Sequence, residues 1–332
     1  MAELEEKAIK ELCKVRGIGP ASAKKLVEAG ITSIADLASA RPEEVRDILG
    51  TTSKRAKLII QYAKDCLFEQ EVLALAAKEL EKIRSEKVQI ISTGVKAIDA
   101  ILGGGFRTDA LHLLAGSFST GKTAMCYQVG VKCAIDYERC VLFIETEPQV
   151  FHASRVREIA KGFGADPEAV LDKFYVIPSE RIKTPEQLFT AYDYAEKMIT
   201  KDKIDIGVII IDSFSAPFRA YYHGRETLTD RSQEIARHIG KLEYLADKFN
   251  AAIIATAQVY GVPDLGLQIA HEARMAMRKA IYGGELQLHS FSYILVLERV
   301  GKEKCVITLV DSSHLPRKSA YFSITREGLR DV

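Results

Sequence analysis

The sequence predicts an α/β fold with a mixed, mainly parallel sheet, preceded by a small all-α domain. Three observations support this expectation. Apolar runs of strand length alternate with longer helical patterns through the middle of the chain, which is typical of a parallel sheet with helices on both faces. Three more strand-like runs follow near the end with only short turns, which favours antiparallel strands. Before all of these, helical patterns are separated by glycine and proline.

Residues 1–64 are predicted to form the all-α domain. A Gly-x-Gly-Pro turn separates two helical stretches, and a second cycle begins after Gly30. This turn has the pattern of a helix-hairpin-helix, which can present backbone N–H groups to a nucleic-acid phosphate without reading bases. We therefore expect Gly17, Gly19 and Lys24 to contact DNA. The alternative is a tight interhelical turn within a protein-docking module.

Residues 65–87 are rich in Leu, Ala, Glu and Lys, and they read as a linker that covers apolar surface, not necessarily on its own chain. The second domain then spans 88–332. Its predicted parallel strands are 111–115, 140–145, 173–177, 206–212 and 252–257. Helices are expected at 123–136, 184–201 and 230–249, and antiparallel strands at 291–299, 304–310 and 320–325. Thr184 and Pro185 provide an N-cap and a first helical residue.

A complete G-x-x-x-x-G-K-[ST] phosphate loop lies between the first of these strands and its helix. It comprises Gly116, Ser117, Phe118, Ser119, Thr120, Gly121, Lys122 and Thr123. The glycines let backbone N–H groups approach phosphate oxygens, and the helix N-terminus adds its positive dipole end. Lys122 is expected to reach the β and γ phosphates of ATP, and Thr123 to bind Mg²⁺.

Carboxylates end two of the other apolar strands. Asp212 ends the run Gly-Val-Ile-Ile-Ile-Asp, an arrangement that brings a carboxylate beside the Mg²⁺ of the phosphate loop. Glu145 ends the strand predicted at 140–145, and Glu147 follows it by two residues. A nucleotide hydrolase needs one such group to orient the attacking water. We choose Glu147; Glu145 is the second candidate, and a purely supporting role near the metal is the alternative for both. Gln258 is expected to hydrogen-bond the γ phosphate.

Two segments of the second domain carry basic residues suited to single-stranded DNA. The first interleaves basic and aromatic groups after Asp212 and contains Arg219, Tyr222, Arg225 and Arg231. Backbone phosphates and stacked bases require both kinds of group. The second follows Gln258 and contains Arg274, Arg278 and Lys279. An ordinary solvated loop is the alternative for each segment, and composition alone favours that alternative for the second.

The composition narrows the class of protein. The 46 basic and 45 acidic residues leave a net charge of +1, so any surface for nucleic acid must be local. The six cysteines include no C-x-x-C pair, which argues against a zinc site and favours reduced, packed thiols. No apolar run has the length that spans a bilayer, and the acidic start is unlike a signal peptide. We expect a cytoplasmic protein that does not contact a membrane.

Taken together, the motifs resemble those of the archaeal RadA recombinases, which are relatives of bacterial RecA. The resemblance covers nearly the whole chain. The motifs that carry it, beside the phosphate loop, are Ile91-Ser92-Thr93-Gly94, Asp99, Gly103-Gly104-Gly105, Phe218-Arg219-Ala220, Gln258-Val259, Asp311, His314-Leu315-Pro316 and residues 322–328. It implies a RecA-like ATPase core and a DNA-dependent ATPase that assembles as a homo-oligomeric filament or ring on single-stranded DNA. That assembly would pair the strand with a homologous duplex during recombinational repair.

The resemblance also implies further site residues. Ala124, His152 and Arg155 would contact the nucleotide, and the segment from Asp311 to Pro316 would cap ATP held by a neighbouring protomer. The two basic segments would be the DNA-binding loops. Recombination mediator proteins are further candidate partners.

Several positions depart from the family pattern. His152 stands where an adenine-stacking Arg is usual, and Ala124 where Gln is common. The polymerisation motif Phe-x-x-Ala fits only Leu73 to Ala76, with Leu in place of Phe. That change loses aromatic contact area worth about 1 kcal/mol or more per interface. The departures suggest two alternatives to a recombinase: an accessory paralogue without efficient filament formation, and a partner-binding module whose ATPase is vestigial.

Overall fold

The computed structural model describes residues 2–71, 76–222, 227–258, 290–301 and 303–332. The chain divides into two compact units, Met1–Arg84 and Ser85–Val332. None of the helices in the described ranges is long and apolar enough to cross a membrane.

The first unit is all-helical, as predicted. Its helices are α1 (Ala2–Leu12), α2 (Pro20–Glu28), α3 (Ile34–Ser39), α4 (Pro42–Leu49) and α5 (Ser53–Glu71); α6 (Ala77–Lys87) spans the division between the units. One apolar core, which includes Leu12, Leu26 and Leu37, holds the two helical cycles together. Gly17 has a φ of 91°, a conformation that residues with a side chain rarely adopt, so the predicted interhelical turn depends on glycine here.

The second unit is built on a nine-stranded sheet with the order β11-β10-β9-β8-β3-β7-β6-β4-β5. The parallel part comprises β3 (Leu111–Gly116), β4 (Cys140–Glu145), β5 (Phe174–Ile177), β6 (Ile206–Asp212), β7 (Ala252–Gln258) and β8 (Tyr293–Arg299). The antiparallel part adds β9 (Lys304–Ser312), β10 (Lys318–Thr325) and β11 (Gly328–Asp331). The mixed, mainly parallel sheet is thereby confirmed. The expectation that 291–299 extends the sheet as an antiparallel strand was wrong in part, because β8 runs parallel to β3 and is antiparallel only to β9.

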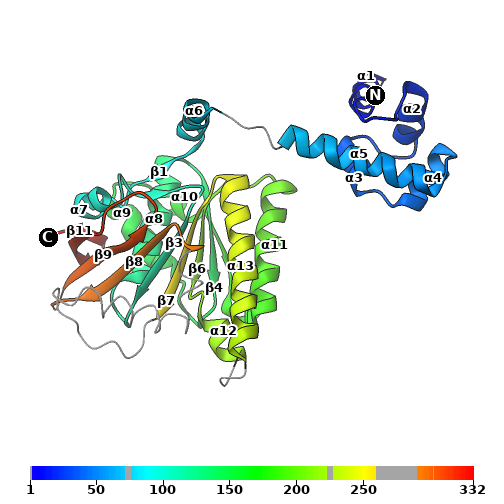
Figure 1. Ribbon diagram of the computed structural model, residues 1–332. Coiled ribbons are helices and arrows are strands. Elements are labelled where there is room, and N and C mark those ends of the chain that lie inside the picture. Colours follow the sequence, from blue (N-terminus) through cyan, green and yellow to red (C-terminus); the bar gives the residue numbers. More distant parts are fainter. Residues whose placement is uncertain (1, 72–75, 223–226, 259–289, 302) are drawn as a thin grey trace. The chain divides into compact units, whose positions relative to one another are not determined.

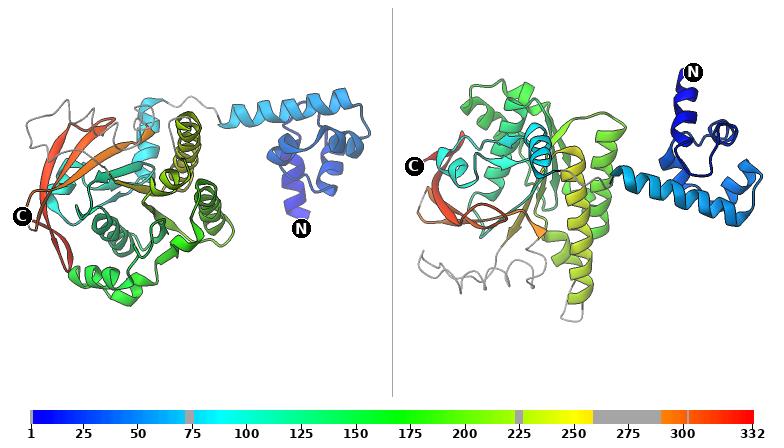
Figure 2. Two further views of the ribbon diagram at one scale, coloured as in Figure 1. Left: turned by 90° about the horizontal axis from the view of Figure 1, so that it is seen from below. Right: turned by 45° about the horizontal axis from the view of Figure 1, so that its top comes forward.

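Helices cover both faces of this sheet (Figures 1 and 2). They are α7 (Lys96–Ile101), α8 (Lys122–Asp136), α9 (Ala153–Gly162), α10 (Pro167–Leu171), α11 (Pro185–Thr200), α12 (Ala216–Tyr221) and α13 (Leu228–Phe249). A short 3₁₀ helix, η1 (Ser179–Arg181), precedes α11, and a two-stranded sheet joins β1 (Ile90–Ile91) to β2 (Phe106–Arg107). Thr184 caps α11 with a reciprocal capping box, and Pro185 is its first residue, as expected.

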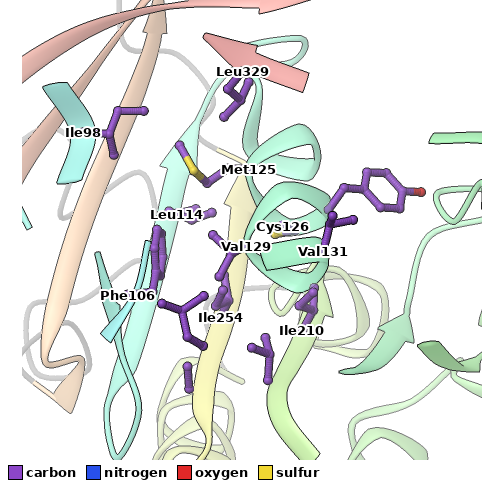
Figure 3. Close-up of a cluster of buried hydrophobic side chains, with 14 of the residues drawn as sticks. Ile98, Phe106, Leu114, Met125, Cys126, Val129, Val131, Ile210, Ile254 and Leu329 are labelled. Carbon is purple, nitrogen blue, oxygen red and sulfur yellow. The ribbon is translucent and has the colours of Figure 1, made fainter. Parts of the chain in front are cut away.

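Alternate residues of each central strand enter different cores, because side chains alternate across a strand. Ile210 of β6 belongs to the core beneath α8, whereas Ile209 and Ile211 belong to the core beneath α11 and α13. Figure 3 shows the first core, in which Met125 and Val129 of α8 face the strands. Burial on both faces explains why β6 is an unbroken apolar run and not an alternating one.

Candidate nucleotide-binding site

The carboxyl ends of β3, β4, β6 and β7 meet at one edge of the sheet. Their register pairs Gly116 with Gln258 and Glu145 with Asp212. Strands that are distant in sequence therefore deliver the phosphate loop and the acidic residues to one place. This is the edge at which open parallel sheets bind ligands.

The phosphate loop connects β3 to α8, and both of its glycines are structurally required. A Cβ atom on Gly116 would lie 2.4 Å from the carbonyl oxygen of Leu297, on the neighbouring strand β8. Gly121 has a φ of 99°, and a Cβ there would lie 2.9 Å from the side chain of Ile324. The loop is therefore packed against the sheet in a way that only glycine permits.

Lys122 is folded back onto this loop. Its Nζ donates to the carbonyl oxygens of Gly116 at 2.9 Å and Ser117 at 2.6 Å, and only 8% of the residue is exposed. Burial lowers the pKa of Lys122, with nearby Asp212 acting in the opposite direction. The lysine holds the loop in shape, and both of its partners are neutral carbonyl groups.

Asp212 lies next to Thr123, as the two motifs predict. Its carboxylate accepts a hydrogen bond of 2.6 Å from the Thr123 hydroxyl, and the Thr256 hydroxyl donates to its other oxygen. Burial raises the pKa of Asp212, whereas these two hydrogen bonds lower it. The Thr123 hydroxyl and the buried Asp212 carboxylate offer adjacent oxygen atoms, which are the kind of ligand that Mg²⁺ prefers.

A cavity of about 460 Å³ opens at this edge, a size typical of small-molecule sites. Most of the residues expected to bind nucleotide, metal or water line it: Phe118, Ser119, Thr120, Gly121, Lys122, Thr123, Ala124, Glu147, His152, Arg155, Asp212 and Gln258. Four of the predicted nucleotide-binding residues do not line it: Gly116, Ser117, Asp311 and Pro316. Phe118 is 85% exposed, an unusual value for a large apolar side chain.

The two candidate carboxylates have different surroundings. Glu145 is 6% exposed, and its oxygens accept hydrogen bonds from the backbone N–H groups of Val150 at 2.5 Å, Phe151 at 2.9 Å and Ser179 at 3.2 Å. Glu147 instead lines the cavity, where its oxygens lie 3.2 and 3.4 Å from the amide nitrogen of Gln258. Glu145 is thus committed to holding backbone in place, while Glu147 faces the space that a ligand would occupy.

Some lining residues were not predicted from the sequence. Tyr127 of α8 donates to the carbonyl oxygen of Val150 at 2.7 Å and accepts from the N–H of His152 at 2.6 Å. Burial raises the pKa of this tyrosine, so it stays a neutral donor. Arg299, at the end of β8, donates to the carbonyl oxygen of Ser119 at 3.2 Å. Neither residue lies in a motif; each acts because α8 or β8 runs past the cavity.

The residues expected to contact DNA are only partly described. Lys24, on α2, is exposed, and Arg219 and Tyr222 lie on and directly after α12. Arg231 lies in the first turn of α13. Arg225, Arg274, Arg278, Lys279 and the interface residue Leu73 lie outside the described residues. Ala76 directly precedes α6 and is exposed.

A phosphate loop, an adjacent buried carboxylate and a mixed, mainly parallel sheet define a P-loop ATPase of the RecA type. Comparison with known proteins identifies the family. The Rad51 family model matches residues 83–332, and the model described as a SAM-like helix-hairpin-helix tandem matches residues 9–65. The chain belongs to the Rad51 family.

Curated relatives match it over almost their full length. The chain is 32% identical to the "DNA repair and recombination protein RadA" of Aeropyrum pernix, over 98% of both chains. It is also 32% identical to the proteins of that name from Metallosphaera sedula, over 99% of this chain and 98% of the relative, and from Ignicoccus hospitalis, over 98% and 97%. The RadA resemblance expected from the motifs is confirmed.

Proposed function

We propose that this protein is an ATP-dependent DNA recombinase, which assembles on single-stranded DNA and promotes homologous pairing and strand exchange. The observation that carries the proposal is the convergence of Lys122, Thr123, Asp212, Glu147 and Gln258 on one cavity. Full-length similarity to proteins named for DNA repair and recombination supports the same function.

Each residue of the cavity has a role in hydrolysis under this proposal. Thr123 and Asp212 would hold Mg²⁺, which neutralises charge on the phosphates when bound. Lys122 would exchange its two carbonyl partners for phosphate oxygens, a stronger charge-assisted contact. Glu147 would orient the attacking water, and the Gln258 amide would hydrogen-bond the γ phosphate. The segment held by Glu145 and Tyr127 would place His152 and Arg155 against the nucleobase side of the ligand.

The remaining assignments concern partners. We assign DNA contacts to the helix-hairpin-helix domain, residues 1–64, through Gly17, Gly19 and Lys24, and to the two basic segments of the core, residues 88–332. The linker, residues 65–87, would anchor a neighbouring protomer through Leu73 and Ala76, and Asp311 and Pro316 would cover that neighbour's ATP. Recombination mediators are further proposed partners, and the proposed location is the cytoplasm.

Electron microscopy with single-stranded DNA tests the proposal, with a non-hydrolysable ATP analogue compared with ADP. Helical filaments that form only with the analogue are the expected result. Discrete small oligomers in both nucleotide states would instead favour an accessory relative that does not form filaments.

Replacement of Lys122 by Ala provides the matched variant for the same experiment. It should abolish ATP-dependent DNA binding, because it removes the charge that would contact the phosphates. DNA binding by the unaltered protein should also weaken steeply as salt rises, since contacts to phosphates release counterions. Intact nucleotide-dependent assembly of the Lys122→Ala variant would contradict the proposed site.

A further inference from the structure

Arg219 connects the proposed DNA-binding segment to the proposed catalytic carboxylate. It is the fourth residue of α12, the helix that follows the short loop after β6. One nitrogen of its guanidinium group donates to the Ser215 hydroxyl at 2.6 Å, and the other lies 3.4 Å from an oxygen of Glu147. From the sequence, Arg219 was expected to contact DNA and Glu147 to contact water, and neither expectation places the two side chains together.

Both oxygens of Glu147 face donors in this arrangement. The Gln258 amide lies 3.2 Å from one oxygen and 3.4 Å from the other, and Arg219 approaches the second of these. A carboxylate that orients water must offer a lone pair to it. The donor groups of Arg219 and Gln258 therefore compete with water for Glu147.

The ion pair is weak enough to be exchanged. The side chains of Arg219 and Glu147 are 32% and 31% exposed, and their 3.4 Å separation is long for a charge-assisted hydrogen bond. Exposed pairs of this kind are only marginally stable, because water and salt screen them. A phosphodiester offers the same guanidinium group a better partner, since its two oxygens match the planar fork of arginine.

The backbone beneath Arg219 is held firmly. Phe218, the preceding residue, is fully buried, and its ring lies 4.8 Å from that of His238 and 5.2 Å from that of Phe214. These contacts fix α12 against α13 and against the loop that follows β6. An exchange of partners therefore requires only that the partly exposed Arg219 side chain turn, with no movement of the helix.

We propose that Arg219 is a positioning residue that restrains Glu147 until a DNA phosphate takes its guanidinium group. Without DNA, Arg219 draws the Glu147 carboxylate away from the attacking water. With DNA, the phosphate replaces Glu147 as the partner, and the carboxylate is released to orient water. This inference rests on the proposed function, and it assigns the DNA dependence of hydrolysis to one side-chain contact.

Steady-state ATP hydrolysis by the full chain tests the inference. Rates are measured at saturating ATP with and without an oligothymidylate, for the unaltered protein and for Arg219→Gln. The substitution should raise the DNA-free rate about two- to fivefold, the range expected for loss of an exposed ion pair. It should lower the stimulation by DNA by at least the same factor.

Salt provides a second readout that needs no substitution. The DNA-free rate of the unaltered protein should increase as salt screens the pair, and the rate of Arg219→Gln should not. Arg157→Gln is the matched control, because it removes another partly exposed pair, between Arg157 and Glu168, that lies outside the cavity lining. It should change neither the DNA-free rate nor the stimulation.

The outcomes separate this inference from the proposed function. If the unaltered protein is stimulated by the oligothymidylate but the DNA-free rate of Arg219→Gln is unchanged or lower, the restraint is wrong and the recombinase proposal stands. If the oligothymidylate neither binds nor stimulates the unaltered protein, the proposed function fails. A DNA-free rate that falls in Arg219→Gln would mean that Arg219 holds Glu147 in its productive position.

Discussion

Replacement of Glu145 by Gln tests which of the two candidate carboxylates, Glu145 or Glu147, orients the attacking water. Glu145 accepts three hydrogen bonds from backbone N–H groups. Two come from Val150 and Phe151, in the segment between β4 and α9, and the third comes from Ser179, the first residue of η1. In the variant, the amide oxygen can keep the bonds from Val150 and Phe151. The amide nitrogen then faces the N–H of Ser179, so a donor meets a donor.

The cost follows from these contacts. Loss of one hydrogen bond to a charged, buried group costs about 1.5–3 kcal/mol, and the two retained bonds become weaker because the acceptor is neutral. We therefore expect about 3 kcal/mol of lost stability. For a domain of this size, that corresponds to a decrease in Tm of roughly 6–12 °C.

Thermal unfolding monitored by circular dichroism, together with ATP titration, measures the effect. Glu147→Gln is the matched control, because Glu147 is partly exposed and has only long side-chain contacts in the cavity. It should leave Tm unchanged and abolish hydrolysis while ATP still binds. The reasoning would be refuted if Glu145→Gln kept its Tm and its ATP affinity but lost hydrolysis, since Glu145 would then be the residue that orients water.

Three further substitutions test other parts of the core. Arg139→Met should lower the stability by about 2–3 kcal/mol, measured by chemical denaturation, because Arg139 is 7% exposed and its loss leaves the backbone carbonyl groups of Ile206 and Asn250 without this donor, while the exposed Asp205 carboxylate stays solvated; an unchanged denaturation midpoint would contradict this. Gly121→Ala should abolish ATP binding and lower Tm, because its Cβ would collide with Ile324 at a φ that disfavours alanine; normal ATP titration would show that the loop can adjust. Burial lowers the pKa of His238 to about 4 from 6.5, so the unfolded chain binds a proton more readily than the folded one between these values. Stability should therefore fall as the pH decreases from about 6.5 to about 4, by roughly 3 kcal/mol for this group. In His238→Phe, that share of the pH dependence should be absent from urea denaturation series.

Patterns local in the sequence predicted most elements of the fold. The bounds expected for β4 and β6 agree with the structure, because each is an apolar run whose length and ends can be read from consecutive residues. The capping residues of α11 were likewise predictable. The strand β11 was not predicted, because four residues that begin with glycine carry too little periodicity. Its place in the sheet depends on its pairing with β10.

The residues of the candidate site likewise include some that local patterns predicted and some that they did not. The phosphate loop, Asp212, Glu147 and Gln258 were predicted, because each belongs to a short motif or ends an apolar strand. Tyr127 and Arg299 were missed, since nothing in their neighbouring residues marks them.

The sequence by itself determined which chemistry the chain carries, because a phosphate loop and strand-terminal polar residues are encoded in a few adjacent positions. The tertiary structure alone decided how those groups meet. Sheet order places β3 between β7 and β8, and β6 beside β4, although these strands are far apart along the chain. That order brings Gln258 and Arg219 each within hydrogen-bonding reach of Glu147. Glu145 instead accepts hydrogen bonds from backbone N–H groups and does not line the cavity. Contacts of this kind arise from the packing of distant segments, which no local pattern records.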